Sequence, residues 1–366
     1  MSTCLSITSI LAKALNLEPI TADEGVLLYT KASLSELMFV ANELRKKWHP
    51  NQEVTWIIDR NVNITNVCSS GCLFCNFHCS SKSEKAYITT IEEYDQKIAT
   101  LFELGGDQIL LQGGMHPDLG LSFYEDLFRE LKKRHPKLKL HALGPPEIVY
   151  LSKKAGISYR ETLVRLIAAG LDSLPGAGAE ILVDDVRSKI SRNKCSSQEW
   201  LDAMHEAHKL NLTTSATMML GHIETETQRI EHLIKIRELQ DKKPIGTKGF
   251  LSFIPWPFQG ENTALVKKYR NLAPISSTDY IRFIAIARIV LNNIPNIQAS
   301  WLTVGTETAQ VCLHSGANDL GSIMIEENVV SAAGANHKLD AGLMQLKIRQ
   351  AGFEPIRRNQ HFDKLQ

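Results

Sequence analysis

The sequence predicts an α/β fold, a (β/α)8 TIM-type barrel with helical N- and C-terminal extensions. Short apolar runs alternate with amphipathic helical runs about eight times from residue 54 onward, which is typical of a parallel sheet. Glycine-rich and polar motifs follow these apolar runs repeatedly, and in a closed barrel such strand ends meet at one mouth. An open doubly wound sheet also fits the alternation, and the same residue types mark ordinary turns. The near-eightfold count favours the barrel.

Hydrophobic periodicity places the individual elements. Helical spacing within residues 1–50 predicts an N-terminal helical extension. The apolar runs expected as strands are residues 54–59, 108–114, 137–143, 171–178, 213–220, 249–256, 296–302 and 316–321. The helical runs between them include residues 91–104, 122–134, 197–210, 225–239 and 278–291. We assign residues 51–335 to the barrel and 336–366 to a C-terminal helix, over 338–350, with a polar tail that shows no chemistry of its own.

Composition excludes several classes of function. The chain has 366 residues, of which 43% are hydrophobic and 22% charged, so it can bury a sizeable core. Lysine and arginine number 41 against 40 aspartate and glutamate, a balance that gives no support to a nucleic-acid-binding surface. No apolar run is long enough for a membrane span, and the N-terminus lacks the features of a secretory signal. We therefore expect a cytoplasmic protein.

A cysteine cluster is the central chemical signal. The chain has seven cysteines, an odd number that makes a poor disulfide framework, and Cys68, Cys72 and Cys75 have the spacing Cys-x3-Cys-x2-Cys. Three thiolates from one loop suit an iron–sulfur cluster, in which a cubane would keep one iron open for an external ligand. Two alternatives remain. One is a zinc site with Cys79 or His78 as the fourth ligand, and the other is redox pairing of Cys72 with Cys75.

This loop resembles the signature of the radical S-adenosylmethionine superfamily. The aromatic Phe74, directly before the third cysteine, is typical of that signature. The resemblance implies that Cys68, Cys72 and Cys75 bind a [4Fe-4S] cluster whose open iron binds S-adenosyl-L-methionine. Reductive cleavage of that cofactor then yields a 5′-deoxyadenosyl radical, so the protein supplies binding, orientation and exclusion of water.

Three further motifs match the superfamily in order. Gln112, Gly113 and Gly114 follow the second predicted strand, where the superfamily has a Gly-Gly turn against the methionyl amine. Glu180 follows the fourth strand, where a polar residue often holds the ribose. Glu224 ends a Gly-x-x-Glu run after the fifth strand that resembles the adenine-side motif. Each motif alone is common, because Gly-Gly turns and acids at helix starts occur widely.

A closer resemblance covers roughly residues 50–335. The chain resembles the group that contains the futalosine-pathway enzymes and the deazaflavin (FO) synthase subunits, and within it the dehypoxanthine futalosine cyclase (cyclic dehypoxanthinyl futalosine synthase) family of menaquinone biosynthesis. The blocks that carry this similarity are DRNVNITNVC, LQGGMHPDL, GPPEIV, AGLDSLPGAGAEIL, ATMMLGHIET, FIPWPFQ, SGANDLG and MIEENVVSAAGA. The rivals are aminofutalosine synthase, a deazaflavin synthase subunit and, from another class, a zinc-stabilised binding protein without catalysis.

The resemblance implies an intramolecular radical reaction on a small, nucleoside-derived substrate. The adenosyl radical would abstract the ribose C4′ hydrogen, and the carbon radical would add to the attached aromatic ring. Loss of one electron and one proton would then restore aromaticity. His222 is the first candidate for the base and Asp319 the second, although His222 also fits a packed structural histidine. We further expect an external low-potential electron donor and consider a homodimer.

The chain departs from the family pattern directly after the third cysteine. Asn76, Phe77, His78 and Cys79 stand where relatives have Ala-Phe-Tyr or a similar run. Cys79 is an extra thiol that is inert, an oxidation liability or a zinc-type ligand. Residues 255–258, Pro-Trp-Pro-Phe, could form a wall against the aromatic ring of the substrate or simply pack.

Overall fold

An eight-stranded parallel barrel forms the centre of the molecule. The structure, a computed structural model, describes residues 6–334 and 337–365. Seven strands pair in chain order in one parallel sheet. Their bounds are β2 (Asp59–Asn63), β3 (Gln108–Gln112), β4 (Lys139–Ala142), β5 (Ser173–Leu174), β6 (Thr213–Leu220), β7 (Phe250–Pro257) and β8 (Asn296–Ile297). The predicted TIM-type fold is confirmed.

A first strand in two parts closes this barrel. β1 (Glu53–Ile57) runs directly into β2, and β1 pairs in parallel with β9 (Asp319–Ser322). β9 in turn meets the end of β8 through a parallel bridge between Gln298 and Asp319. The sequence predicts only one strand here, over residues 54–59. Because Asp59 and Asn61 line a cavity inside the barrel, β2 has polar residues at inward positions and shows no apolar alternation.

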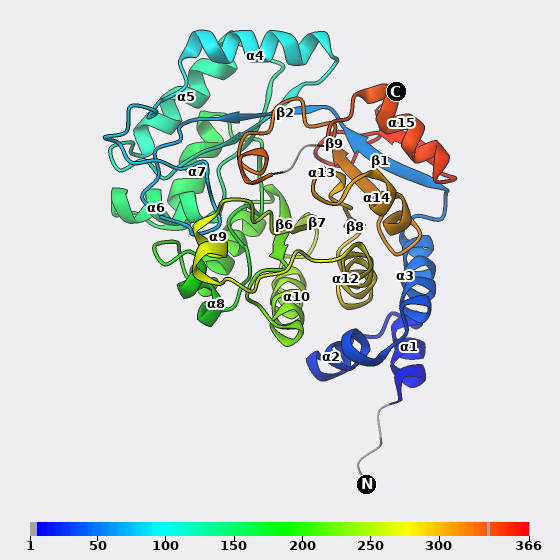
Figure 1. The fold of residues 1–366 in the computed structure, drawn as a ribbon. Coiled ribbons are helices and arrows are strands. Elements are labelled where there is room, and N and C mark those ends of the chain that lie inside the picture. The colour runs from blue at the N-terminus through cyan, green and yellow to red at the C-terminus, as the bar shows by residue number, and fades with distance from the viewer. Residues whose placement is uncertain (1–5, 335–336, 366) are drawn as a thin grey trace.

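Helices surround the barrel on its outer side (Figure 1). They are α4 (Ile91–Glu103), α5 (Leu121–Arg134), α6 (Pro145–Ala155), α7 (Tyr159–Ala169), α8 (Asp184–Ile190), α9 (Ser197–Lys209), α10 (Glu226–Asp241), α12 (Ser277–Val290) and α14 (Thr306–Leu313). Two short helices lie elsewhere: α11 (Ala264–Lys268) contacts the loop that follows β2, and α13 (Trp301–Val304) lines the cavity inside the barrel. Several begin with a capping box, in which a serine or threonine and a glutamate or glutamine satisfy the first free amides, as at Thr90 and Thr225. All five predicted helical runs are confirmed within two residues.

Other parts of the barrel also differ from the sequence prediction. Helix α6 was not predicted, because its Gly-Pro-Pro start resembles a turn, yet Pro145 occupies the first helical turn, where no amide hydrogen is needed. The runs 171–178 and 296–302, each expected as one strand, contain only the two-residue strands β5 and β8. Trp301 then begins α13, and its indole donates to the Ser322 carbonyl at 3.0 Å.

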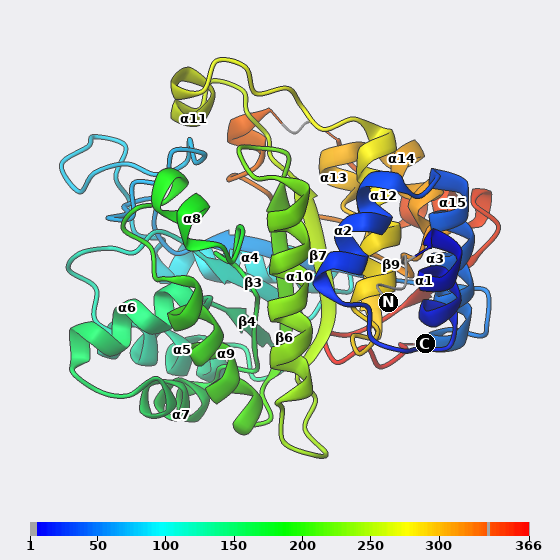
Figure 2. The same cartoon turned by 90° about the horizontal axis from the view of Figure 1, so that it is seen from below.

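The N-terminal segment packs three helices against one side of the barrel. They are α1 (Ile7–Leu15), α2 (Ala22–Lys31) and α3 (Leu34–Trp48). α2 contacts α10 and α12, and α3 lies along α12 (Figure 2). Leu28 and Leu37 are fully buried in these contacts. The buried Arg45 also donates to the carbonyl of Ala317, which ties α3 to the chain just before β9.

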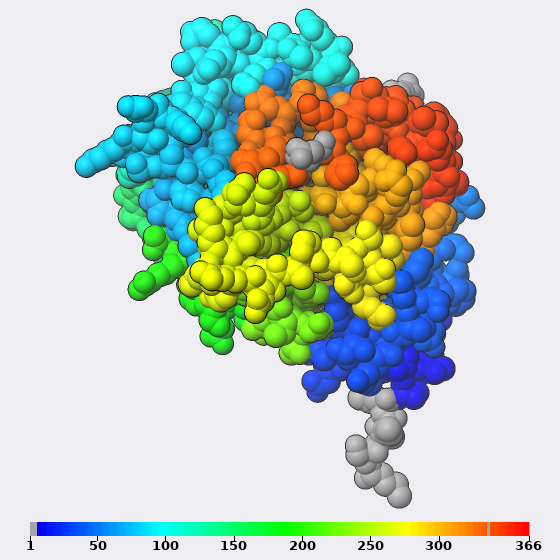
Figure 3. All heavy atoms as spheres, viewed as in Figure 1, coloured from blue at the N-terminus to red at the C-terminus, as the bar shows by residue number. Residues whose placement is uncertain are grey.

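The C-terminal segment is more structured than the sequence predicts. After the short 3-10 helix Ser331–Ala333, α15 (Ala341–Gln350) leads into β10 (Glu354–Arg357), which pairs in parallel with β1. In Figure 3 this segment (red) lies on the same side of the molecule as the N-terminal helices (blue). The following tail reaches the barrel, where Arg358 binds Asp319 of β9. The expected polar tail is thus an integral part of the fold.

Within residues 6–334 and 337–365, no helix combines the length and the apolar character that crossing a bilayer requires.

We predict that Arg358→Ala strongly destabilises the protein. Arg358 Nε and Nη2 donate to the two oxygens of Asp319 at 2.6 and 2.9 Å, and both side chains are buried. Removing the guanidinium leaves a buried, unpaired carboxylate, which costs about 3–5 kcal/mol. Urea denaturation would measure this loss. Arg129→Ala, which removes an exposed ion pair, is the control and is expected to change stability by less than about 1 kcal/mol.

We also predict that stability falls as pH falls below about 6.5. Burial lowers the pKa of His49 to about 4 and the pKa values of His141, His208 and His232 to about 3. The unfolded chain, with histidine pKa values of about 6.5, therefore binds protons in this range that the folded chain does not bind. Denaturation between pH 7.5 and 4.5 should show His208→Gln with a weaker pH dependence than wild type. The variant His314→Gln, at an exposed histidine, is the control and should keep the pH dependence of the wild type. An equal pH dependence in His208→Gln and wild type would contradict the prediction.

Candidate active site

The barrel encloses a cavity of about 370 Å³, which falls within the range of small-molecule sites. Its wall includes residues from the cysteine loop, from the strands and from the C-terminal tail. Most of the motifs predicted from the sequence meet here, because parallel strands of a barrel deliver their carboxyl ends to one mouth.

Three cysteine side chains line this cavity together. Cys68, Cys72 and Cys75 belong to the loop that follows β2. Ser70 lies between two of them, with its Oγ 2.9 Å from Cys68 Sγ and 3.4 Å from Cys72 Sγ. Gly71 has a φ of +59°, a conformation that glycine adopts without strain and that turns the loop back. The loop therefore presents three thiols to one space.

The Gly-Gly turn after β3 supports this loop. Gly113 and Gly114 both line the cavity, and the Gly114 amide donates to the Thr65 carbonyl at 2.8 Å. A Cβ atom on Gly114 would lie 2.0 Å from the Val67 carbonyl oxygen, so no other residue fits at this position. One residue further on, the Met115 amide donates to Cys68 Sγ at 3.3 Å. Gln112 lines the cavity beside this turn.

A buried ion pair lies next to the cysteines. Glu180, which follows β5, lines the cavity and accepts a hydrogen bond from Lys194 Nζ at 2.7 Å. Burial disfavours the charged form of Lys194, but Cys72 and Glu180 more than offset this and raise its pKa. The ammonium group also lies 5.4 Å from the centre of the Phe74 ring. Lys194 was missed from the sequence because it lies in a polar loop that does not directly follow a strand.

Glu147 is another carboxyl at the cavity, and the sequence did not single it out. It belongs to the first turn of α6 and lines the cavity. Burial raises its pKa to about 7, and its Oε2 is buried with no hydrogen-bond partner among the described residues. The only signal in the sequence was its place in the block GPPEIV, which carried the resemblance without indicating a role.

His222 and Glu224 lie outside the cavity, in the turn after β6. Glu224 accepts hydrogen bonds from the amides of Gly221 and His222, at 2.6 and 2.9 Å, and pairs with Arg229. The His222 ring packs edge-on against Phe258, and its Nε2 lies 3.2 Å from the Met219 carbonyl oxygen. In this structure both side chains hold the turn together and neither reaches the cysteines.

Asp319 is likewise committed to the fold. Both of its oxygens bind Arg358, and Thr55 Oγ1 and the Gly321 amide also donate to it. It is fully buried and is not among the described residues that line the cavity. Its two successors Leu320 and Gly321 do line it.

The residues that depart from the family pattern mostly hold the cysteine loop. The Asn76 amide donates to the carbonyls of Glu261 and Ala332, at 2.8 and 3.2 Å. His78 lines the cavity with its Nδ1 2.9 Å from the Cys75 carbonyl oxygen. The Cys79 carbonyl accepts a hydrogen bond from the Cys68 amide, and the Cys79 amide donates to the Asn66 carbonyl. Cys79 is not among the described residues that line the cavity.

The cysteine arrangement fits a cluster that spreads its ligands over several metal atoms. Among the described residues, no three histidine, cysteine, aspartate or glutamate side chains are placed to hold one metal ion. The ligands of a cubane bind different irons and have no need to converge on a point. Three thiols at one cavity, with no fourth protein ligand needed, match a [4Fe-4S] cluster that keeps one iron open.

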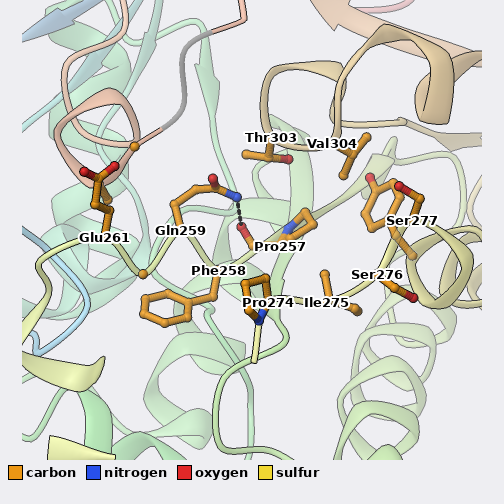
Figure 4. Close-up of a pocket in the computed structure, with 14 residues that line it drawn as sticks. Pro257, Phe258, Gln259, Glu261, Pro274, Ile275, Ser276, Ser277, Thr303 and Val304 are labelled. Carbon is orange, nitrogen blue, oxygen red and sulfur yellow. Dashed lines mark hydrogen bonds between the residues drawn. The ribbon is translucent and has the colours of Figure 1, made fainter. Parts of the chain in front are cut away.

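A second cavity of about 300 Å³ lies beyond β7 (Figure 4). Its wall includes Phe258, Gln259 and residues from the segment that leads into α12, and Gln259 Nε2 donates to the Pro257 carbonyl at 3.1 Å. The aromatic side chains of the run 255–258 therefore belong to different cavities. Trp256 lines the barrel cavity, whereas Phe258 lines this second one. The cysteines, Glu180 and Lys194 all belong to the barrel cavity, which is the candidate active site.

Comparison with known protein families agrees with the predicted cluster-binding site. Residues 62–236 match the radical SAM superfamily, and residues 247–366 match the CofH/MqnC C-terminal region. The chain is 40% identical over 359 residues to a cyclic dehypoxanthine futalosine synthase of Halalkalibacterium halodurans, with 98% of this chain and 95% of the relative covered. It is 43% identical over 349 residues to the enzyme of that name from Streptomyces coelicolor, with 94% and 86% covered.

A second group of relatives has a different name. The chain is 37% identical over 348 residues to a 5-amino-6-(D-ribitylamino)uracil–L-tyrosine 4-hydroxyphenyl transferase of Methanosarcina mazei, with 94% and 88% covered.

Solved structures share the fold at low sequence identity. The [FeFe]-hydrogenase maturase HydG matches with a TM-score of 0.73 at 15% identity, covering 96% of this chain and 75% of that one. Methylornithine synthase (PylB) matches with a TM-score of 0.69 at 18% identity, covering 96% and 98%. The resemblance seen in the sequence is confirmed, and the chain belongs to the radical SAM superfamily, within the family that has the CofH/MqnC C-terminal region.

Proposed function

We propose that the protein cyclises dehypoxanthine futalosine to cyclic dehypoxanthinyl futalosine in menaquinone biosynthesis. The observation that carries the proposal is the set of three cysteines facing one cavity, in a chain that is 40–43% identical over nearly its whole length to enzymes named for this reaction. The substrate is a small molecule, and the cavity has the size and the mixed polar and aromatic wall for one.

Each part of the site has a distinct task in this proposal. Cys68, Cys72 and Cys75 hold the [4Fe-4S] cluster. The Gly113-Gly114 turn, next to Gln112, permits close backbone approach to S-adenosylmethionine, and Glu180 contacts it with Lys194 as ion-pair partner. Together the bound cofactors supply a 5′-deoxyadenosyl radical. The barrel encloses the reacting carbon and keeps water away from it.

We assign the proton acceptor to Glu147. The reaction releases one proton, and the Glu147 oxygen that has no hydrogen-bond partner among the described residues can receive it. Burial raises the pKa of Glu147 to about 7, which suits a base that works near neutral pH. His222, Asp319 and Glu224, which the sequence singled out, do not line the cavity; they stabilise its surroundings through hydrogen bonds to the backbone and to arginine.

The proposal also requires an external low-potential electron donor, which would reduce the cluster before each radical is formed. A cytoplasmic location and a homodimer remain predictions from the sequence.

The transferase relatives define a second candidate function. At 37% identity over 94% of the chain, transfer of a 4-hydroxyphenyl group from tyrosine competes with cyclisation. The two functions differ in what is consumed, because cyclisation needs one organic substrate and the transfer needs two.

We predict that reconstituted, reduced protein with S-adenosylmethionine converts dehypoxanthine futalosine to a cyclised product. Mass spectrometry would detect a product two hydrogens lighter, together with 5′-deoxyadenosine. The triple variant Cys68→Ala/Cys72→Ala/Cys75→Ala should lose the broad absorption near ~400 nm and all turnover. Consumption of tyrosine with 5-amino-6-(D-ribitylamino)uracil, without cyclisation, would instead establish the transferase.

We predict that Glu147→Gln lowers kcat by about a hundredfold or more, because loss of a general base typically costs 10²–10⁴-fold. Formation of 5′-deoxyadenosine without product should persist, since the radical step precedes the proton transfer. Glu147→Asp should restore part of the rate with a shifted acid limb of the pH profile. A Glu147→Gln enzyme with wild-type kcat would remove Glu147 from the mechanism.

A further inference from the structure

The barrel cavity has a polar end opposite the cysteines. Asp59 is the first residue of β2 and Asn61 the third, whereas the cysteine loop begins after the other end of that strand. From the C-terminal tail, Arg358 and Gln360 line the same cavity, and His141 of β4 joins them. We call these five residues the barrel floor.

The tail is joined to the floor by a chain of hydrogen bonds. Gln108 Nε2 donates to Gln360 Oε1 at 3.2 Å and lies 3.4 Å from Asp59 Oδ2. Gln360 Nε2 lies 3.4 Å from His141 Nε2, and His141 Nδ1 lies 2.8 Å from Ser173 Oγ. Residues from β2, β3, β4 and β5 are thereby connected through one glutamine near the end of the chain. Gln360 is a positioning residue in this arrangement.

The floor does not suit an anionic ligand. Arg358 is its one arginine, and its guanidinium is already bound at two points by Asp319. Asp59 adds a second carboxyl near the same guanidinium, and burial raises the pKa of Asp59. Burial also keeps His141 neutral, since it lowers the pKa of His141 to about 3. A neutral group that exchanges hydrogen bonds fits this surface better than a carboxylate or a phosphate.

The surroundings of Asn61 indicate which chemical group a ligand would place at the barrel floor. The residue is 4% exposed and lines the cavity, and among the described residues its Oδ1 has no hydrogen-bond partner. A buried amide without partners is costly, and a ligand hydroxyl would remove that cost. Asp59, two residues away on the same face of β2, offers a further acceptor at the adjacent inward position.

We propose that Asn61 and Asp59 bind hydroxyl groups of the substrate's pentose at the barrel floor, with Gln360 of the C-terminal tail holding that floor in place. The inference rests on the proposed function and extends it, because it assigns the residues that recognise the sugar. It places the sugar hydroxyls on the side of the cavity away from the cluster, so that the opposite face of the ring is turned toward the radical. The family's C-terminal segment then contributes to substrate recognition as well as to the fold.

The test combines Asn61→Ala with substrate analogues that each lack one hydroxyl of the pentose, at the 1′, 2′ or 3′ position. For the full substrate we expect Asn61→Ala to lower kcat/KM about five- to tenfold, the effect of one neutral hydrogen bond. For the analogue that lacks the hydroxyl bound by Asn61, the same substitution should change kcat/KM by less than about twofold. This loss of additivity isolates the contact from any general effect on folding.

Controls separate recognition from damage to the enzyme. Asn61→Leu keeps the branched shape of the side chain without its hydrogen-bonding atoms and should show the same pattern. Asn292→Ala removes a surface amide that donates to the Leu17 carbonyl and should leave all rates unchanged. Cluster content and 5′-deoxyadenosine formation without substrate should match wild type in every variant.

Two results would overturn the inference in different ways. If Asn61→Ala lowers kcat/KM equally for the full substrate and all three analogues, or leaves it unchanged, Asn61 does not bind a hydroxyl of the sugar and the proposed function stands. If the wild-type enzyme cyclises neither the substrate nor the analogues, the proposed function fails, and the inference fails with it.

Discussion

The site depends on a close contact between two stretches of backbone. Gly114 lies so near the Val67 carbonyl that a methyl group there would overlap it, at 2.0 Å. This contact joins the turn after β3 to the cysteine loop, and the hydrogen bond from the Met115 amide reaches Cys68 directly. Because the turn is fixed by the end of a core strand, the loop takes its position from the barrel. A loop of polar and small residues would not otherwise hold three thiols toward one cavity.

The opposite end of the barrel is closed by residues from the two ends of the sequence. β1, near the N-terminus, pairs with β9 on one side and with β10, near the C-terminus, on the other. Arg358 then binds Asp319 inside the fold, and Gln360 lies beside His141. The cavity therefore lies between a cofactor end, made by the loops after the strands, and a polar floor. In the proposed reaction, a radical formed at the cofactor end would meet a substrate held from the floor, which would favour reaction at one carbon over quenching.

The sequence predicted the elements with strong periodicity and the motifs with fixed spacing. The helices and the long strands β6 and β7 follow from apolar patterns, and the cysteines and the Gly-Gly turn follow from local spacing. The sequence could not indicate β2, whose inward residues are polar because they line a cavity. Nor could it indicate Lys194 or Glu147, since the contacts that bury them join segments distant in sequence. His222 and Asp319 are the opposite case. Their positions at strand ends suggested that they face the active site, but in the structure His222 contacts a backbone carbonyl and Asp319 binds an arginine.

The central claim is that the three cysteines hold a cluster with one iron open to S-adenosylmethionine. Electron paramagnetic resonance of the reduced, reconstituted protein tests it directly, because the signal of a reduced cluster changes when a ligand binds to one of its irons. We expect a spectrum that shifts when S-adenosylmethionine is added and does not shift with adenosine or buffer alone. A reduced cluster with an identical spectrum before and after addition would contradict it.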